Sequence, residues 1–269
     1  FSFVSFKKLF AFGSKILFTN LYSTFISNIE SVLIGKVFSP ASLGYFFRAS
    51  STKDLPLKTF SNAITLPVYS LLAKHNDNPI EFKKIHLKFY KLIAFIFFPI
   101  SFGMIALASP LVIVLYTEKW LPSVSIIQIL SITIVCFLLG YLQDQTIIAI
   151  GGANKYLKLT MVNKTLKLFT IPIGLMFGLE SFIISLSTIS ILQLLYSNYM
   201  GGKYVQMNNL NYAILIAPYF FAALFMGVIA FILNTFLFDS QILKLLIIAP
   251  IGAITYLTIS ILFKFEELQ

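Results

Sequence analysis

The stretch KFYKLIAFIFFPISFGMIALA, from Lys88 to Ala108, carries no charged side chain after Lys91. A helix of about 20 such residues is long enough to cross the hydrocarbon core of a bilayer. Similar stretches recur along the chain, at Leu9–Phe38, Leu43–Leu72, Pro122–Ile150, Tyr156–Phe177, Ser181–Gly201, Tyr212–Phe236 and Gln241–Phe263. We therefore predict an all-α integral membrane protein, a bundle of about eight transmembrane helices.

The composition also indicates a membrane protein. Hydrophobic residues make up 58% of the 269 residues and charged residues only 11%, whereas about a quarter of a soluble domain is charged. The formal net charge of +10 would favour nucleic acid in a soluble protein. Here the lysines lie in short segments between apolar runs, as the positive-inside rule predicts, so we expect no nucleic-acid partner. Cys136, the single cysteine, lies in an apolar run, and we expect neither a disulfide framework nor a metal site.

The lysines favour an N-terminal end in the cytoplasm, because that orientation leaves only Lys36, Lys119 and Lys244 outside. The doubtful span is Leu43–Leu72; if it lay on the membrane surface, the orientation would reverse. The chain begins with Phe rather than Met and has no signal peptide, so we expect it to be the later part of a longer protein. Ser109–Thr117 is too short to cross and predicts a short interfacial or re-entrant helix.

Charged residues inside the predicted spans are the main candidates for function, because each costs about 2.5 to 3.5 kcal/mol at a lipid-exposed helix centre. Leu43–Leu72 contains Arg48, Lys53, Asp54 and Lys58. Asp54 and Lys58 can pair along a helix, and a proline between them removes a backbone hydrogen bond. We therefore predict a kinked helix that lines a polar cavity, with Arg48, Lys53 and Lys58 as substrate-binding cations. Alternatively, Asp54 and Lys58 only neutralise each other against a neighbouring helix.

Other polar candidates lie in the first and fourth predicted spans. Asn28 and Gln145 are further candidates for the substrate cavity. Glu30 and Asp144 are single carboxylates in apolar surroundings, where a carboxylate can couple transport to H+ or Na+, form an ion pair or serve as a structural hydrogen-bonding group. We expect no cofactor beyond such a coupling ion.

Signatures of an enzyme are weak. His75 and His86, the only histidines, lie in or beside a predicted polar loop, Ala73–Leu87, without metal-ligand spacing or a nucleophile motif. We interpret both as loop residues and predict no catalytic residue. Lys164 and Lys167 lie within the fifth predicted span, where they either snorkel to the cytoplasmic interface or face the interior.

Several strings match the pattern of a known family. They are Phe12-Gly13, Ile34-Gly35-Lys36, Leu43-Gly44-Tyr45, Arg48-Ala49, Leu55-Pro56, Leu66-Pro67 with Ser70, Ser109-Pro110-Leu111, Glu118-Lys119-Trp120-Leu121-Pro122, Gln128-Ile129-Leu130 and Ala149-Ile150-Gly151 with Asn154. Over about Leu9 to Lys167, the chain resembles the second half of Wzx-type polysaccharide flippases, in the multidrug/oligosaccharidyl-lipid/polysaccharide exporter superfamily.

This resemblance implies a two-lobed transporter in the bacterial inner membrane. Residues 1–201 would be its second six-helix lobe and residues 202–269 two additional helices, with the first lobe absent from this chain. The substrate would be an undecaprenyl-diphosphate-linked oligosaccharide, a precursor of O-antigen, capsule or exopolysaccharide. Arg48, by motif position, would bind the diphosphate, and the polysaccharide polymerase machinery is a possible partner. Transport would proceed by alternating access.

The resemblance leaves alternatives open. Lys53, Asp54 and Asp144 depart from the family pattern, and they fit an anionic sugar, a coupling ion or simple pairing. Within the superfamily, a drug or cation antiporter and a peptidoglycan-precursor flippase are alternatives, although the Glu118–Pro122 run argues against both. A membrane polysaccharide polymerase or ligase would need a large external loop, and all predicted outside loops are short. A purely structural membrane subunit would not need four charges in one span.

Overall fold

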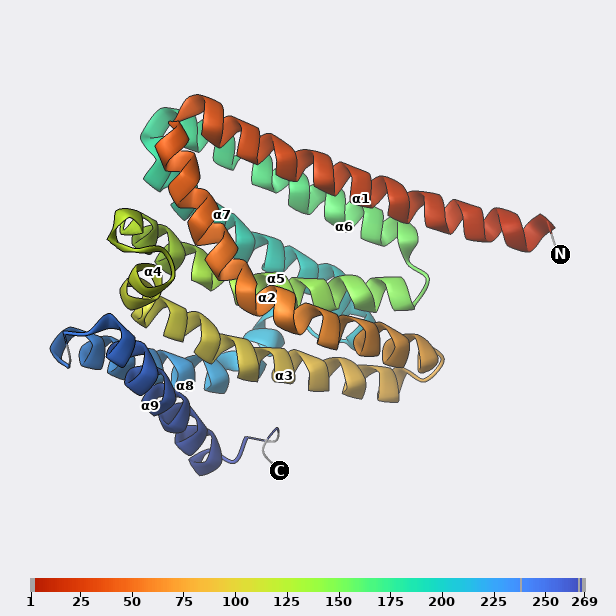
Figure 1. Cartoon of the computed structure of the whole chain (residues 1–269). Coiled ribbons are helices and arrows are strands. Elements are labelled where there is room, and N and C mark those ends of the chain that lie inside the picture. The colour runs from red at the N-terminus through yellow and green to blue at the C-terminus, as the bar shows by residue number, and fades with distance from the viewer. Residues whose placement is uncertain (1–2, 238, 266, 268–269) are drawn as a thin grey trace.

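The computed structural model describes residues 3–237, 239–265 and 267; at some positions of the first two helices it describes the backbone alone. Within these residues the regular elements are all helical, which confirms the predicted all-α class (Figure 1). They are α1 (Phe3–Val37), α2 (Pro40–Lys74), α3 (Pro79–Ala106), α4 (Ala108–Tyr116), η1 (Glu118–Trp120), α5 (Ser123–Ala149), α6 (Ala153–Leu168), α7 (Thr170–Val205), α8 (Asn209–Phe236) and α9 (Gln241–Leu262).

The protein is a multi-pass membrane protein. Five of the described helices are long and apolar enough to cross a bilayer: α3, α5, α7, α8 and α9. α2 is a continuous helix of 35 residues, but its charged and polar residues make it less apolar than these five, and α6 has only 16 residues. The predicted short helix is confirmed as α4, which has nine residues.

The fifth and sixth predicted spans are divided differently in the structure. α6 ends at Leu168, and the chain continues directly into α7, which contains a non-helical residue, Gly178, with φ 87° and ψ −179°. A positive φ of this size favours glycine because other residues carry a Cβ that clashes there. The chain therefore turns at Gly178, between the predicted spans Tyr156–Phe177 and Ser181–Gly201.

α3 begins nine residues before the predicted start at Lys88. The Asn78 side chain accepts a hydrogen bond from the backbone N–H of Glu81, and Pro79 occupies the first helical position. An asparagine cap followed by proline is a strong start signal for a helix. The predicted polar loop Ala73–Leu87 is therefore largely helical.

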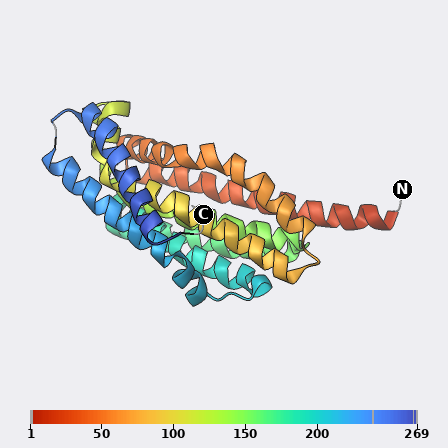
Figure 2. The ribbon, with the colours of Figure 1, turned by 90° about the horizontal axis from the view of Figure 1, so that it is seen from below.

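α5 is the central helix of the bundle. It packs against α2, α3 and α7, and its side chains Ile127, Ile134 and Leu139 are completely buried. α1 lies along α6 on one side of the bundle, and α8 and α9 lie on the opposite side (Figure 1). Figure 2 shows α9 crossing α8 and α3. The side chains between α2, α5, α6 and α7 therefore face one another inside the bundle.

Candidate functional site

A cavity of about 770 Å³ lies between α1, α2, α5, α6 and α7. This volume is within the range of small-molecule sites, about 300 to 1,000 Å³. Its charged lining residues are Lys53, Asp54, Lys58, Asp144, Lys164 and Lys167. Its neutral polar lining includes Ser23, Ser50, Ser51, Thr133, Thr160, Asn163, Ser190, Gln193 and Ser197, and its aromatic lining Phe46, Phe47, Phe137, Tyr141 and Tyr156. The prediction that α2 lines a polar cavity is confirmed.

The cavity carries more positive than negative charge. Among the side chains that the structure describes, four lysines line it, two from α2 and two from α6, against two aspartates, one from α2 and one from α5. Charges in a partly desolvated space interact more strongly than they do in water, since the effective dielectric constant is lower. The lining is therefore suited to an anionic ligand.

One aspartate pairs within α2. The Lys53 Nζ and the Asp54 Oδ1 are 3.1 Å apart, and the two side chains are 20% and 38% exposed. The predicted pair between Asp54 and Lys58 is therefore wrong: the carboxylate contacts the adjacent lysine instead. Lys58 is exposed, whereas the more buried Lys53 ammonium has lost more water and gains more from a carboxylate partner.

The second aspartate is associated with α6. Asp144 on α5 interacts electrostatically with Lys164. Lys164 and Lys167 both line the cavity, which favours the interior position over snorkelling alone. From the sequence alone these two lysines were not predicted as cavity residues, because a lysine near a helix end commonly reaches the interface.

Neutral polar groups complete the lining at the junction of α6 and α7. The Asn163 side-chain amide donates to the Ser197 hydroxyl at 3.1 Å, and the Gln193 side-chain amide donates to the backbone carbonyl of Asn163. Rings of Phe137 and Tyr141 stack beside them with centroids 6.4 Å apart. Hydroxyls and amides can donate and accept hydrogen bonds to sugar hydroxyls, and aromatic faces offer apolar surface. Sequence reasoning missed this lining, because isolated serines and threonines carry no charge signal.

Three predicted cavity residues do not line this cavity. Arg48 lies on another face of α2, with its guanidinium carbon 5.0 Å from the ring centre of Tyr116 and 4.9 Å from that of Trp120. Gln145 is buried next to Asp144 but faces away, since adjacent residues of a helix point about 100° apart. Asn28 is exposed on α1. The side chain of Glu30 lies outside the described residues.

His86 is not a loop residue, and that interpretation of the sequence is wrong for it. Because α3 begins at Pro79, His86 lies on the second turn of a helix, and its side chain is completely buried. Its Nδ1 is 2.8 Å from the Thr146 hydroxyl and its Nε2 is 2.8 Å from the Tyr212 hydroxyl. The imidazole therefore joins α3, α5 and α8 behind the cavity wall.

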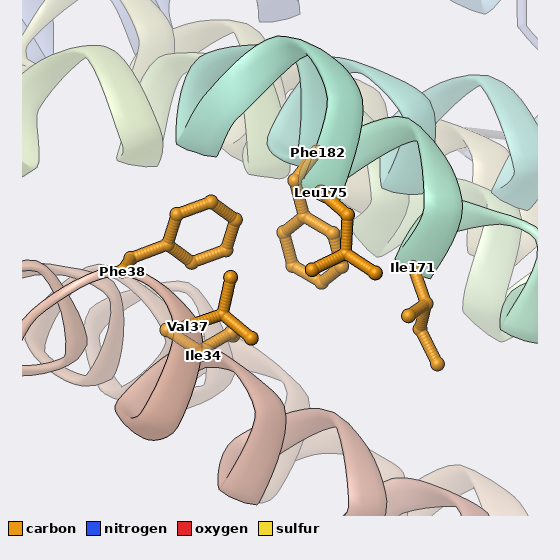
Figure 3. Close-up of a pocket in the computed structure, with 6 residues that line it drawn as sticks. All are labelled: Ile34, Val37, Phe38, Ile171, Leu175 and Phe182. Atoms are coloured by element: carbon orange, nitrogen blue, oxygen red, sulfur yellow. The ribbon is translucent and has the colours of Figure 1, made fainter.

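A second, apolar crevice lies where the end of α1 meets the turn within α7. Figure 3 shows its lining: Ile34, Val37, Phe38, Ile171, Leu175 and Phe182. Its volume is about 10 Å³, close to the space of one water molecule. This crevice is a packing contact between α1 and α7, too small to hold a substrate.

Comparisons with known proteins agree with this architecture. The family of polysaccharide biosynthesis proteins matches residues 1–125. The teichuronic acid biosynthesis protein TuaB of Bacillus subtilis (strain 168) is 24% identical over 148 residues, which cover 55% of this chain and 31% of TuaB. The solved lipid II flippase MurJ, in an inward closed conformation, superimposes with a TM-score of 0.78 at 18% identity. The resemblance to polysaccharide exporters is confirmed.

The two kinds of match carry different information. The MurJ match covers 100% of this chain and 57% of MurJ, and at 18% identity it shows a shared fold alone. The sequence matches show similarity to polysaccharide biosynthesis proteins over part of the chain. The region matched to TuaB spans less than a third of that protein's length.

Proposed function

We propose that this chain forms part of a flippase that moves an anionic, undecaprenyl-diphosphate-linked oligosaccharide across the bacterial inner membrane for surface polysaccharide biosynthesis. The proposal rests on the cationic cavity inside the helix bundle, where the described lining has four lysines and two aspartates. An excess of lysines in a membrane protein is costly unless anions accompany them. A diphosphate and its glycan would supply those anions.

The lysines of α2 and α6 would bind the diphosphate. Lysine binds phosphate as a compact point charge, with no fixed geometry, which suits a ligand that must be released on the far side. The serine, threonine and amide groups of the same lining would bind glycan hydroxyls. Asp144 and Asp54 would bind the coupling ion, H+ or Na+, or balance the lysines between transport steps.

The charge of the cavity argues against a drug or cation antiporter. Such a protein must attract cations, and the excess of lysines over aspartates repels them. A peptidoglycan-precursor flippase is the second candidate, favoured by the superposition on MurJ. Cavity charge does not separate the two flippases, but the matches to the polysaccharide biosynthesis family and TuaB favour the polysaccharide substrate.

Cys136 permits a direct test of substrate binding. It is the single cysteine of the sequence and it lines the cavity. Its reaction rate with a water-soluble thiosulfonate should fall when the purified protein in lipid nanodiscs is given undecaprenyl diphosphate. Undecaprenol, which lacks the phosphates, is the matched control and should give little protection. Equal protection by both lipids would show that phosphates are not recognised.

Deletion in the native organism tests the direction of transport. Loss of the protein should strip one surface polysaccharide and leave its lipid-linked repeat units on the cytoplasmic leaflet. Repeat units on the outer leaflet would instead indicate a polymerase or ligase. Accumulation of peptidoglycan precursor would support the second candidate, and altered drug tolerance with intact glycan would support an antiporter.

A further inference from the structure

Arg48 lies in an aromatic cluster beside α2 and does not line the cavity. Its guanidinium lies over the rings of both Tyr116, at the end of α4, and Trp120, in η1, at 5.0 and 4.9 Å from the ring centres. A planar, delocalised guanidinium stacks on aromatic faces in a way that an ammonium does not. The same side chain thereby contacts two consecutive elements, α4 and η1.

Further contacts hold this face of α2 against the same two elements. The hydroxyls of Thr52 and Tyr116 are 3.1 Å apart and share a hydrogen bond. The Tyr45 ring meets the Trp120 ring edge to face, with centroids 5.9 Å apart. Trp120 also packs against Gly44, where an added Cβ would lie 3.7 Å from the indole. We call Arg48, Tyr116 and Trp120, with Thr52 and Tyr45, the outer clamp.

The outer clamp and the cavity use different residues of α2. Gly44, Arg48 and Thr52 are four residues apart and lie on one stripe of the helix. At 3.6 residues per turn, the cavity residues Phe46, Ser50 and Leu57 lie about half a turn away from Arg48. Phe47, Ser51 and Lys58 also line the cavity and lie about a quarter of a turn from it. A rotation of α2 that released the outer clamp would therefore also move Lys53 and Lys58.

We propose that Arg48 is a positioning residue. Through its contacts with the rings of Tyr116 and Trp120, it fixes the rotation of α2 so that Lys53 and Lys58 face the cavity, and it acts without contacting the substrate. The consequence for transport rests on the proposed function, whereas the positioning of α2 does not. The competing role is direct binding of the diphosphate by Arg48, and the experiment below separates the two.

The sequence provides a native reporter for each face of α2. Trp120 is the single tryptophan and lies in the outer clamp, and Cys136 is the single cysteine and lines the cavity. Emission of Trp120 and its quenching by acrylamide report on the clamp. The thiosulfonate rate of Cys136 without ligand reports on the cavity. Both are measured on the purified protein in nanodiscs.

Arg48→Ala should raise the quenching of Trp120 and change the unliganded rate of Cys136 severalfold. Arg48→Lys should rescue both readouts in part, because an ammonium keeps the charge but lacks the planar guanidinium that can contact both rings at once. Lys119→Ala is the matched control: it removes an exposed cation next to Trp120 and should leave both readouts unchanged. Tyr116→Leu removes one ring of the outer clamp and should change both readouts in the same direction as Arg48→Ala. It replaces Arg48→Ala in the test if the alanine variant does not fold.

An Arg48→Ala protein with unchanged Trp120 quenching and unchanged Cys136 rate would overturn the proposal. If that protein also lost its protection by undecaprenyl diphosphate, Arg48 would be a direct ligand of the phosphate. Failure of the proposed function looks different. In that case undecaprenyl diphosphate protects Cys136 in no variant, while the two unliganded readouts still test whether Arg48 positions α2.

Discussion

The Nε2 of His86 and the hydroxyl of Tyr212 lie 2.8 Å apart, although the residues are 126 positions apart in the chain. The directions of the hydrogen bonds follow from the neighbours. The Thr146 hydroxyl donates to the carbonyl of Leu142 at 2.8 Å, so it accepts from the His86 Nδ1–H. A neutral imidazole then has only an acceptor left at Nε2, and the Tyr212 hydroxyl must be the donor.

A second set of contacts extends this network into α7. The Tyr90 hydroxyl and the Gln143 side-chain amide both donate to the Asn198 Oδ1, at 3.1 and 2.8 Å. The rings of Tyr90 and Tyr212 stack with centroids 4.4 Å apart. Gln143 and Asn198 each adjoin a residue that lines the cavity. The polar network therefore connects α3 and α8 to the cavity wall formed by α5 and α7.

Tyr212→Phe should destabilise the protein, because it leaves the buried Nε2 of His86 without a donor. Loss of one partner from a buried hydrogen bond costs about 1–3 kcal/mol. The measurement is thermal unfolding of the purified protein in detergent. Tyr199→Phe is the matched control, since Tyr199 is exposed on α7. Equal stability of both variants would show that the Tyr212 hydroxyl contributes nothing.

Gly201→Ala should lower stability, because an added Cβ would overlap the side chain of Gln143. Gln143 is completely buried and donates to Asn198, so it has little freedom to move. Overpacking of this kind costs about 1–3 kcal/mol. Gly13→Ala is the control, since nothing lies within 4 Å of an added Cβ there, and in a helix interior it should be neutral or stabilising. The same thermal unfolding measurement compares the two variants.

Hydropathy and lysine distribution predicted the class of the protein and most of its helices. They also placed α4 and the turn near Gly178, because runs of apolar residues and glycine are local signals. The start of α3 was missed because the predicted span was placed by the length and hydropathy of the apolar run, without regard to the Asn78-Pro79 cap. His86 was consequently assigned to a loop. A capping signal should therefore be given more weight than polarity where a helix enters the membrane interface.

The candidate site was predicted only in part. Lys53, Asp54, Lys58 and Asp144 stood out because charges are rare in apolar spans, and all four line the cavity. Arg48 stood out for the same reason, yet its environment depends on Tyr116 and Trp120, which are far away in sequence. Composition identifies which residues are costly in lipid. It does not show which face of the helix they occupy.

Cysteines at the two ends of α2 should be accessible from opposite sides of the membrane. The variants are Pro40→Cys, at the first residue of α2, and Asn76→Cys, just after its end, each made in a Cys136→Ser background. α2 has 35 residues and is therefore about 50 Å long at 1.5 Å per residue. This length exceeds the bilayer core, although α2 is too charged to be counted among the apolar spans. Impermeant thiol reagents added to right-side-out and inverted vesicles provide the measurement. Labelling of both positions from one side would place α2 on the surface and remove the cavity assignment.

Removing one member of the Lys53–Asp54 pair should impair transport more than removing both. The two groups are 3.1 Å apart in a partly buried position, and a single substitution leaves an uncompensated charge there. Lys53→Gln should therefore reduce surface polysaccharide at matched protein level. Asp54→Asn should reduce it less, because removal of the carboxylate makes the cavity more positive. The double variant should recover part of the loss. Lys244→Gln, which removes a lysine from the first turn of α9, away from the cavity, is the control for loss of charge alone. A contrary result is a double variant whose surface polysaccharide equals the product of the two fractions left by the single variants. That result would show that the lysine and the aspartate act independently, each through its own contact with the substrate or the coupling ion.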